Sequence, residues 1–583
     1  MVALIVLPAL VVALYAPTAD APFLFDDQTS IVFNPGVQKV SPLLARFLSG
    51  NRPLTDLTFA LNYAHAASQT RGYHAVNIAL HAANGLLVYA VARLALGSPA
   101  VAMVPGGAAP WLALGAAALF AAHPLQTETA AYVSGRSEAL ASGFYLLTVL
   151  LYAIAARTRQ RLARLALVTA LLLTCAAALA SKEMAATIPA GLVLYDWCFV
   201  AGGSWRDLRR RWPLIAVTLI PFALGVPILL RRDYHTPSAG FNFSGFGPWD
   251  YLLTQWGVVL HYLRLTLVPI GLCFDTEWPL AKTLWSPAVL ASLGLLLGLV
   301  LVAVLAVRRQ PVLTFAILWV LVVLAPTSSV VPIADLVAER RMYLALMGPV
   351  LLAVVAAWQV AGLAAGARRR ASLRPLVCGL LTVTMVAALS LLTTGRVRVW
   401  ADPVALQEDT VAKAPTNPRA HLNLGAVYLD RNRLDAAELE VLEAQRLYER
   451  GESVHTTDRI GGYIYLNLCS VLYRRQQLDA AAQHCQRALQ LGRSFVPLRS
   501  LANLYLGQIA TRQQQWPVAI GHYRAACWDD VPTIRTYALL HLADAYWRSG
   551  QSDLARQSLN VVLREDPKNP EAVRLQQVLD RAP

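Results

Sequence analysis

Charged residues are scarce in this chain of 583 residues: Asp, Glu, Lys and Arg make up 15%, against 56% hydrophobic residues. In a soluble globular protein about a quarter of all residues are normally charged, so this shortage argues against an ordinary soluble protein. Cysteine is scarce too, and the seven residues form no Cys-x-x-Cys pair and no metal-ligand spacing. No cysteine-based metal site is therefore predicted.

The first segment, MVALIVLPALVVALYAP, has no basic residue before its apolar run. A secretory signal peptide normally begins with such residues, so we favour an uncleaved membrane helix here. Basic residues elsewhere stand in short clusters between apolar runs. Residues 1–394 carry 27 Lys and Arg against 15 Asp and Glu, whereas residues 395–583 carry 23 against 20. This distribution favours membrane topology over nucleic-acid binding as the reason for the net charge of +15.

Eleven apolar runs are long enough to be expected as membrane helices. They cover residues 1–16, 74–96, 107–122, 138–156, 162–180, 184–200, 212–230, 286–307, 311–331, 342–363 and 375–394.

Four basic clusters between these runs predict the orientation of the chain. They are RTRQRLAR (157–164), RDLRRR (206–211), Arg308–Arg309 and ARRRASLR (367–374). Basic loops stay in the cytoplasm, and all four do so if the N-terminus is inside and residues 251–272 do not cross. The loop after the first helix and the tail from residue 395 then face outward.

The tail shows a repeat close to the tetratricopeptide period. A Leu followed by a small residue recurs at Leu424, Leu468, Leu506 and Leu542, and a small residue of a second helix recurs at Ala437, Ala481, Ala519 and Ala555. We therefore expect residues 395–583 to form about four repeats, preceded by a half-repeat and closed by a capping helix. Such arrays usually bind proteins. Cys469 and Cys485 fall at facing positions of one repeat; small core residues are the favoured interpretation, and a disulfide is the alternative.

Acids and bases gather at the ends of the predicted helices on the outer side. Two acids, Asp26 and Asp27, follow the first helix. The bases lie at the ends of other predicted helices; they are Arg136, Lys182, Arg340 and Arg341. Cations near hydrocarbon are costly, so several at one face suggest an anionic partner. Transfer of a sugar from a lipid-linked sugar phosphate would use both the acids and the bases. A carboxylate takes the proton of an acceptor hydroxyl, and cations stabilise the departing phosphate.

Simpler interpretations exist for each group. Asp26 and Asp27 alone would be a solvated loop, Lys182 and Glu183 a helix-capping pair, and residues 339–341 an interfacial anchor. His74 and His81 are more often packing residues, and no acid joins them at a metal-binding spacing.

Several stretches together resemble one family. They are FDDQTSIVFNPGV, NRPLTDLTFALNY, GYHAVNIALHAANGLLVY, AAHPLQTETAAYVSGRSE, ASKEMAATIPAGLVLYDW and AERRMYLAL, followed by the repeats. The chain resembles the transmembrane and tetratricopeptide-repeat-containing (TMTC-like) branch of the GT-C glycosyltransferases, including its bacterial members.

The resemblance implies an all-α protein: a GT-C-type membrane domain over residues 1–394 and a non-cytoplasmic repeat domain over 395–583. It implies an inverting enzyme that moves a sugar, typically mannose, from polyprenyl phosphate to Ser or Thr of proteins. In a bacterium this would be the periplasmic side of the inner membrane. No other cofactor is implied, and a divalent metal is left open. The acceptor protein would bind the repeats, and no nucleic acid is expected.

Each candidate residue then has an expected role. Asp26 is the expected base, with Asp27 orienting the acceptor or loop. The donor phosphate would meet Arg136, Lys182, Arg340 and Arg341. The supporting residues are Arg52, His74, His123, Glu128, Glu138, Glu183, Glu339 and Tyr343. The alternatives are a membrane-anchored scaffold without enzymatic activity, a transferase acting on lipid or polysaccharide and, less favoured, a transporter.

Overall fold

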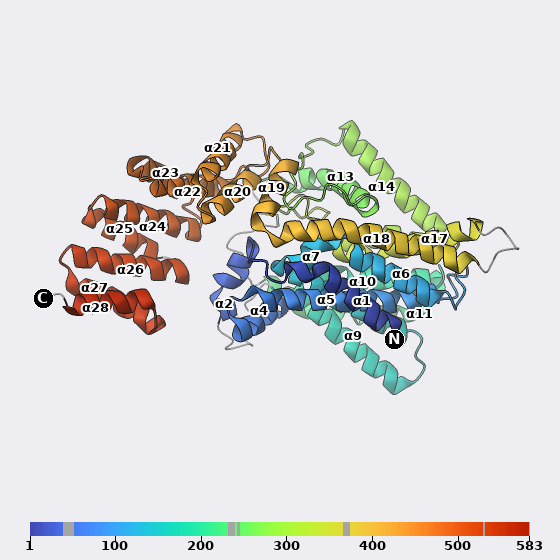
Figure 1. Ribbon diagram of the computed structural model, residues 1–583. Coiled ribbons are helices and arrows are strands. Elements are labelled where there is room, and N and C mark those ends of the chain that lie inside the picture. Colours follow the sequence, from blue (N-terminus) through green and yellow to red (C-terminus); the bar gives the residue numbers. More distant parts are fainter. Residues whose placement is uncertain (39–51, 231–239, 242–244, 365–372, 529–530, 582–583) are drawn as a thin grey trace. The chain divides into compact units, whose positions relative to one another are not determined.

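The structure is a computed structural model that describes residues 1–38, 52–230, 240–241, 245–364, 373–528 and 531–581. Most of the basic cluster at 367–374 lies outside the described residues. The described part is built from helices and contains no β-strand, so the predicted all-α class is confirmed (Figure 1). The chain forms two compact units. The helical unit is residues 1–274 and 280–406, and the repeat unit is residues 275–279 and 407–583.

The helical unit contains the apolar helices predicted from the sequence, together with shorter ones. Its α-helices are α1 (Val2–Tyr15), α2 (Pro35–Gln38), α4 (Pro53–Ala66), α5 (Thr70–Leu96), α6 (Ala109–Ala122), α7 (Thr127–Ala131), α8 (Arg136–Ala155), α9 (Arg161–Ser181), α10 (Ile188–Tyr195), α11 (Trp205–Ala216), α12 (Leu219–Leu230), α13 (Pro248–Leu267), α14 (Pro287–Ala306), α15 (Pro311–Leu324), α16 (Met342–Ala345), α17 (Met347–Ala364) and α18 (Arg374–Ala401).

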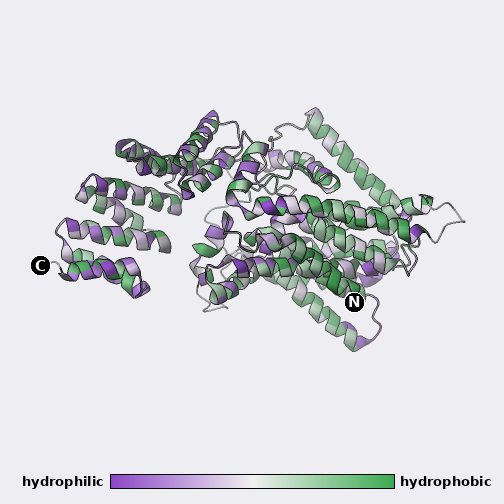
Figure 2. Ribbon diagram, in the orientation of Figure 1, coloured by the Kyte–Doolittle hydropathy of each residue, from purple (hydrophilic) through white to green (hydrophobic). Residues whose placement is uncertain are grey.

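Six segments of the described chain are long and apolar enough to cross a membrane. They correspond to α5, α9, α14, α17, α18 and the segment Val133–Ala155, which contains α8. Helices α1, α6 and α15 are apolar but shorter, and the run predicted at 212–230 is divided between α11 and α12. Figure 2 shows the hydrophobic colour extending along most of these helices.

Small residues let the central helices of this unit approach one another. Helix α6 packs against α5, α17 and α18, and its Ala113, Ala116 and Ala117 are completely buried. A Cβ atom on Gly115 would come within 2.8 Å of the Thr382 side chain. Close backbone approach through small residues is a usual way for helices to associate in a membrane.

The repeat unit consists of antiparallel helix pairs. They are α20 (Pro418–Asp430) with α21 (Leu434–Arg450), α22 (Asp458–Arg474) with α23 (Leu478–Leu491), α24 (Val496–Arg512) with α25 (Trp516–Trp528), and α26 (Pro532–Arg548) with α27 (Ser552–Glu565). Helix α19 (Pro403–Lys413) precedes them and α28 (Pro570–Arg581) follows.

The turn inside each pair has the same backbone conformation at the same register. A left-handed residue lies at Asn432, Gln476, Gln514 and Gly550, with φ of 55°, 65°, 59° and 80°. Each follows the repeated Leu by eight residues, and each ends the first helix of its pair. The small second-helix residues predicted from the sequence are all completely buried. The residues that recur in the sequence repeat are therefore the ones that pack between the helices of the repeat unit.

Cys469 of α22 and Cys485 of α23 form a disulfide across one helix pair. Both residues are buried in the core of the repeat unit. The favoured interpretation of two small, unlinked core residues was wrong. Repeat alignment places the two residues opposite each other, but it cannot show whether the distance between their Cα atoms, here 5.3 Å, suits a bond.

We expect the Cys469→Ala/Cys485→Ala variant to lower the free energy of unfolding of the repeat unit by about 3 kcal/mol. The bridged residues are 16 positions apart in the sequence, and closing a loop of about 15 residues in the unfolded chain contributes about this much. Thermal unfolding of the detergent-purified full chain, with and without reductant, measures the effect. Cys527→Ala, which removes an unbridged cysteine of the same unit, serves as the control. Alkylation of both thiols in the folded, non-reduced chain would contradict the bridge.

Candidate active site

The turn after α1 is closed by the side chain of Asp27. Its Oδ2 accepts a hydrogen bond from Leu24 N at 2.9 Å, while Asp27 N donates to Leu24 O at 2.8 Å. Its Oδ1 accepts from Ser134 N at 2.8 Å and also from Ser134 Oγ. The carboxyl is almost completely buried, and burial raises its pKa to about 7 although these donors act in the opposite direction. Asp27 thus fastens the loop to the turn before α8.

Asp26 has the opposite environment. Its side chain is exposed, and no described residue donates a hydrogen bond to its carboxylate. Its backbone N donates to the Tyr132 hydroxyl at 2.8 Å. The preceding Phe25 has φ of 39°, a left-handed conformation that costs a non-glycine residue on the order of 1–3 kcal/mol. The turn therefore holds Asp26 outward while Asp27 points inward.

Tyr132 and Ser134 are contributors that the sequence reasoning missed, although both lie in a stretch quoted for the family resemblance. The Tyr132 ring stacks on Trp400, with centroids 5.8 Å apart. Between Tyr132 and α8, a Cβ atom on Gly135 would lie 2.6 Å from Thr129 O, so only glycine fits this close approach. Hydropathy and periodicity carry no signal for these contacts.

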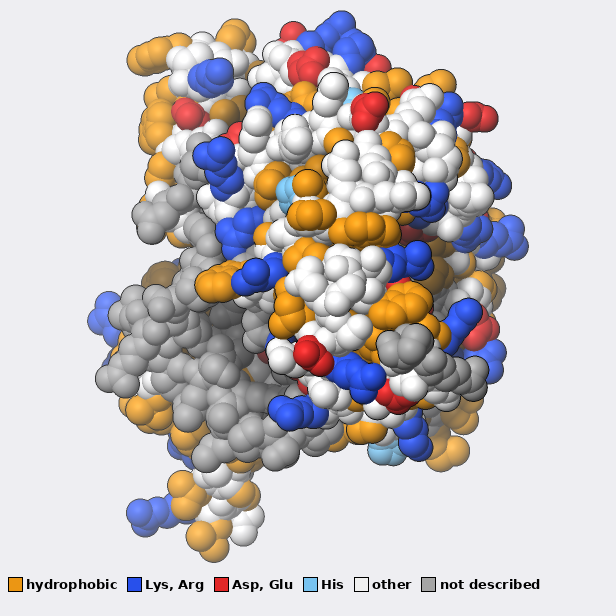
Figure 3. Space-filling model, turned by 90° about the vertical axis from the view of Figure 1, so that its left-hand side faces the viewer, with side chains coloured by type: hydrophobic (Ala, Val, Ile, Leu, Met, Phe, Trp, Pro, Cys, Tyr) orange, Lys and Arg blue, Asp and Glu red, His pale blue; other side chains and the backbone are white. Residues whose placement is uncertain are grey.

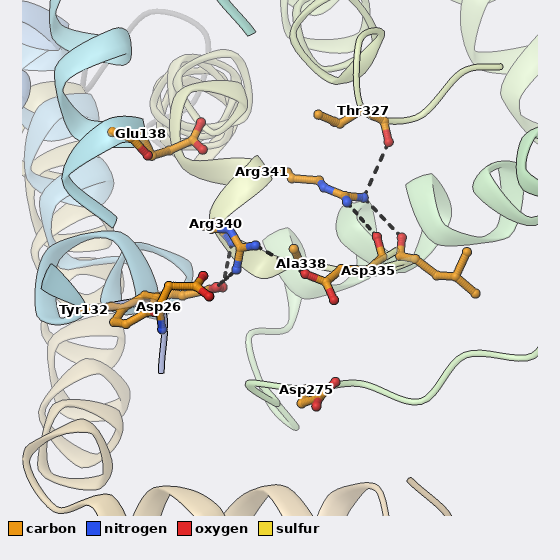
Figure 4. A network of polar contacts seen from close by, with 12 residues as sticks. Asp26, Tyr132, Glu138, Asp275, Thr327, Asp335, Ala338, Arg340 and Arg341 are labelled. Carbon is orange, nitrogen blue, oxygen red and sulfur yellow. Dashed lines mark hydrogen bonds and ion pairs between the residues drawn. The ribbon is translucent and has the colours of Figure 1, made fainter. Parts of the chain in front are cut away.

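Arg340 lies in the 3₁₀ turn Glu339–Arg341 and is held by acids. Its Nη1 donates to Glu128 Oε1 at 2.6 Å and its backbone N to Glu128 Oε2 at 2.8 Å. Nη2 lies 3.5 Å from Asp335 Oδ2. Burial lowers the pKa of Arg340, but the carboxylates of Glu128, Asp335 and Asp26 outweigh it, so the net shift is upward. Arg340 is thus a permanently charged group within electrostatic range of Asp26 (Figure 4).

Arg341 points away from Arg340, as Figure 4 shows. Its guanidinium donates to three main-chain oxygens: Asp335 O at 2.6 Å, Leu336 O at 3.2 Å and Thr327 O at 3.4 Å. A guanidinium has five N–H donors, and this arrangement uses its outer nitrogens to hold the loop before the 3₁₀ turn. The geometry favours a scaffold role for Arg341 over the predicted contact with a phosphate.

Two further ion pairs lie at the ends of α4, α8 and α9. Lys182, which follows α9, donates to Glu138 in the first turn of α8. Arg52, which precedes α4, meets Glu183 through Nη2 at 3.1 Å and Nε at 3.3 Å. The Arg52 and Glu183 side chains remain 39% and 61% exposed, whereas Lys182 and Glu138 are largely buried.

Lys182, Arg52 and Arg340 affect one another electrostatically. Burial lowers the pKa of Lys182, and the charges of Arg52 and Arg340 lower it further, against the opposing effect of Glu138. Arg340 likewise acts on Arg52. The fold thus brings three cations from three distant parts of the sequence into one neighbourhood, which we call the cation cluster.

Arg136 is not part of this cluster. It is fully buried, and all three of its nitrogens donate hydrogen bonds. Nε meets Asn77 Oδ1 at 2.9 Å, Nη1 meets Asn62 Oδ1 at 2.6 Å and Nη2 meets Tyr73 O at 2.9 Å. Its guanidinium also lies over the Phe59 ring, 4.6 Å from the centroid. Arg136, which was predicted to meet the donor phosphate, therefore links α4, α5 and α8 in the structure.

The remaining candidates also hold neighbouring backbone or side chains. His74 Nε2 is 3.0 Å from Ala21 O, and His123 accepts from Leu125 N while its Nε2 lies 3.1 Å from Thr266 O. Tyr343 accepts from Asn84 at 3.0 Å and bonds His81 at 2.8 Å; Glu339 accepts from Cys273 N at 2.6 Å. These contacts tie helices and loops together around the site. Among the described residues, no group of three or more His, Cys, Asp or Glu could hold a metal ion.

Comparisons with known proteins agree with this architecture. A tetratricopeptide repeat family model matches residues 405–452, 466–533 and 535–572. A Caenorhabditis elegans protein O-mannosyl-transferase is 26% identical over 76% of this chain and 62% of its own length. Human protein O-mannosyl-transferase TMTC4 is 26% identical over 74% and 64%, and Drosophila melanogaster Tmtc2 is 33% identical over 48% and 31%.

The chain thus spans somewhat less than two thirds of the length of the first two relatives. A crystal structure of the APC/C hetero-tetramer Cut9–Hcn1 covers 90% of this chain and 89% of its own at 15% identity, with a TM-score of 0.28, too low to support any argument. The relatives confirm the resemblance seen in the sequence motifs: over about three quarters of its length, this chain is similar to proteins named protein O-mannosyl-transferases, human TMTC4 among them.

Proposed function

We propose that the chain is a membrane glycosyltransferase of the GT-C type. In this proposal it moves a sugar, mannose by analogy with the names of its relatives, from polyprenyl phosphate to Ser or Thr hydroxyls of proteins. The observation that carries the proposal is that the two carboxylates of the Asp26–Asp27 pair have different environments. One carboxylate is buried and fastens the loop, and the other is exposed within range of Arg340.

Asp26 acts as the general base. Its carboxylate takes the proton of the acceptor hydroxyl as the hydroxyl oxygen forms a bond to the anomeric carbon. The bond between that carbon and the donor phosphate oxygen breaks on the opposite face, so the configuration inverts and lipid phosphate leaves. Asp27 and Tyr132 position Asp26, through the turn and through its backbone N–H respectively.

The cation cluster of Arg52, Lys182 and Arg340 stabilises the charge on the departing phosphate. Each cation already has a carboxylate partner, so the cluster is held in place before any ligand arrives. Arg136 and Arg341, whose donors are used within the fold, shape the surroundings of the site in this proposal.

The site and the repeats face the non-cytoplasmic side, in a bacterium the periplasmic side of the inner membrane. The basic clusters between apolar runs support this orientation. The disulfide between Cys469 and Cys485 supports it independently, because disulfides persist mainly in oxidising compartments.

The decisive test is to incubate the purified full chain with a panel of polyprenyl-phosphate sugars and envelope proteins, and to search for hexose-modified Ser and Thr by mass spectrometry. Transfer to protein from one donor is expected. Transfer only to lipid or polysaccharide would replace the acceptor class in the proposal. No transfer from any donor would favour a membrane-anchored scaffold whose repeats recruit other proteins.

A further inference from the structure

Helix α11 carries more charge than a membrane-spanning helix normally tolerates. Its 12 residues, WRDLRRRWPLIA, include four Arg and one Asp. A charged side chain at the centre of a bilayer costs about 3 kcal/mol even on lenient scales. These charges argue against a membrane span for α11, although the predicted run 212–230 begins within it.

Helix α5 shows at which end of the helical unit α11 lies. Near its start, His74 Nε2 is 3.0 Å from Ala21 O, beside the candidate active site. Just after its end, Ser98 Oγ donates to Phe199 O, in the segment Asp196–Val200 that leads to α11. A helix of 27 residues is about 40 Å long, close to the thickness of a bilayer with its headgroups. Helix α11 thus lies at the end of the helical unit opposite the candidate active site (Figure 1).

One side of α11 is fixed to the rest of the helical unit. Its apolar residues Leu208, Leu214 and Ile215 are buried. The Arg211 guanidinium forms a bidentate pair with the completely buried Asp196 carboxylate, at 2.6 Å from Nε to Oδ2 and 2.7 Å from Nη2 to Oδ1. Packing and this ion pair therefore set the orientation of the helix about its own axis, and they hold its other side outward.

The outward side carries two tryptophans with an arginine between them. Trp205, Arg209 and Trp212 are spaced by four and three residues, so they form one stripe along the helix, and all three are exposed. The two tryptophans are 55% and 53% exposed. In membrane proteins, tryptophan is enriched at the membrane–water interface, where its ring lies at the level of the headgroups. The stripe therefore indicates that this side of α11 contacts lipid.

The same side of α11 is basic. Arg206 and Arg210 lie beside the stripe and are exposed. The turn between α14 and α15 adds Arg308 and Arg309, which are also exposed. This turn lies close to the start of α11, because a Cβ atom on Gly203 would be 2.9 Å from Arg308 Cγ. We call the five arginines the α11 basic patch; they are Arg206, Arg209, Arg210, Arg308 and Arg309.

Few acids offset this charge. Between residues 184 and 232 the sequence contains two acids, Asp196 and Asp207. The first is paired with Arg211, and Asp207 lies 3.7 Å from Arg210 in an exposed pair, which contributes little. The connections at this end of the unit contain no acid; they are residues 97–108, 156–160 and 307–310. By contrast, basic and acidic side chains are interspersed on the face that Figure 3 shows.

We propose that α11 lies in the membrane–water interface and binds the anionic headgroups of phospholipids. The phosphates meet the α11 basic patch, and Trp205 and Trp212 enter the region between headgroups and acyl chains. The position of α11 at the ends of apolar helices favours lipid over an acidic protein or a nucleic acid as the source of negative charge. In the orientation proposed above, this is the cytoplasmic leaflet. The inference goes beyond the proposed function, because lipid binding needs neither the sugar donor nor Asp26.

The first experiment titrates the detergent-purified full chain with phosphatidylglycerol or phosphatidylcholine and measures the retained lipid by native mass spectrometry. Phosphatidylglycerol should bind about tenfold or more tightly than phosphatidylcholine, because arginines near a membrane surface attract anionic lipid. Arg206→Gln/Arg209→Gln/Arg210→Gln should lower the affinity for phosphatidylglycerol about tenfold or more. Arg209→Gln alone, in case the triple variant misfolds, should lower it about fivefold.

The matched control is Arg450→Gln/Arg493→Gln/Arg574→Gln, which removes three exposed arginines of the repeat unit. It should bind phosphatidylglycerol like the unmodified chain. Equal affinity for the two lipids, or equal losses in the two triple variants, would overturn the proposal. Binding of polyglutamate or of an RNA oligonucleotide that depends on Arg209, without a preference for phosphatidylglycerol, would overturn it too.

A second experiment reports where α11 lies in a bilayer. The full chain and the variant Trp205→Phe/Trp212→Phe are reconstituted in vesicles of phosphatidylglycerol and phosphatidylcholine, and the difference between their emission spectra isolates the two tryptophans. Lipid brominated close to the headgroup should quench this emission more strongly than lipid brominated near the end of the acyl chain. Trp528→Phe is the control, because Trp528 of the repeat unit is 89% exposed and its emission should respond to aqueous iodide alone. The same response to iodide alone from the α11 tryptophans would contradict an interfacial position.

Discussion

Asp26→Asn is expected to abolish sugar transfer, lowering the rate on the order of 10²–10⁴-fold, the usual contribution of a general base. The amide keeps the size of the side chain but cannot take the acceptor proton. Because the Asp26 carboxylate is exposed and accepts no hydrogen bond from the described residues, the change should leave folding intact. Transfer to protein, measured by mass spectrometry, and thermal unfolding of the same preparation provide the two readouts.

Asp20→Asn is the matched control for this variant. Asp20 lies in the same loop region and pairs with Arg71 at the surface, where both side chains are more than 70% exposed. Surface pairs of this kind contribute little to stability, so this variant should transfer sugar at nearly the unmodified rate. Unchanged transfer by Asp26→Asn would remove Asp26 from the mechanism. Loss of transfer in both variants would point to a general effect of charge in the loop.

Asp27→Asn provides a useful contrast to Asp26→Asn. The amide nitrogen cannot accept the hydrogen bond from Leu24 N if the amide oxygen faces Ser134. Asp26→Asn disturbs no such bond. The two variants therefore differ because the Asp27 carboxylate is buried and the Asp26 carboxylate is exposed, although the two residues are identical neighbours in the sequence.

Arg340→Gln is expected to lower transfer on the order of 10²–10³-fold, the usual loss when a donor that stabilises a developing anion is removed. It should also lower thermal stability, because Glu128 would remain buried without its partner. Removing one member of a buried ion pair typically costs about 3–5 kcal/mol. Transfer assays and thermal unfolding in detergent would measure the two effects separately.

The double variant Glu128→Gln/Arg340→Gln separates catalysis from stability. With neither charge present, no unpaired carboxylate remains buried, so most of the thermal stability should return. Transfer should stay low, because the cation is still missing. Arg71→Gln, at the exposed pair with Asp20, controls for general loss of a positive charge. Recovery of transfer in the double variant would show that Arg340 serves only to hold Glu128.

Much of the architecture was predictable because its signals are local in the sequence. Each apolar run is continuous, and the repeated Leu and Ala positions recur within single helices. The same patterns predicted that the ends of several helices carry both acids and bases. They could not show α4 as a separate helix beside the site, because Pro53–Ala66 mixes polar and apolar residues without a long run.

The roles of individual charged residues were less predictable, because they depend on partners far away along the chain. Arg136 and Arg340 are both arginines near helix ends, yet one is surrounded by amides and carbonyls of α4 and α5 and the other is paired with Glu128, 212 positions away. Likewise Cys469 and Cys485 occupy predicted facing positions, but only the packing of α22 on α23 brings their sulfur atoms within bonding distance.

The sequence by itself determined the helical class, the repeat register and the stretches that resemble the TMTC proteins, since each is written in short-range patterns of hydrophobic and small residues. The tertiary structure alone decided which of two adjacent aspartates is exposed and which cations form a cluster. The physical reason is that burial and pairing depend on contacts between distant segments, such as the bond from Ser134 to Asp27 across 107 positions.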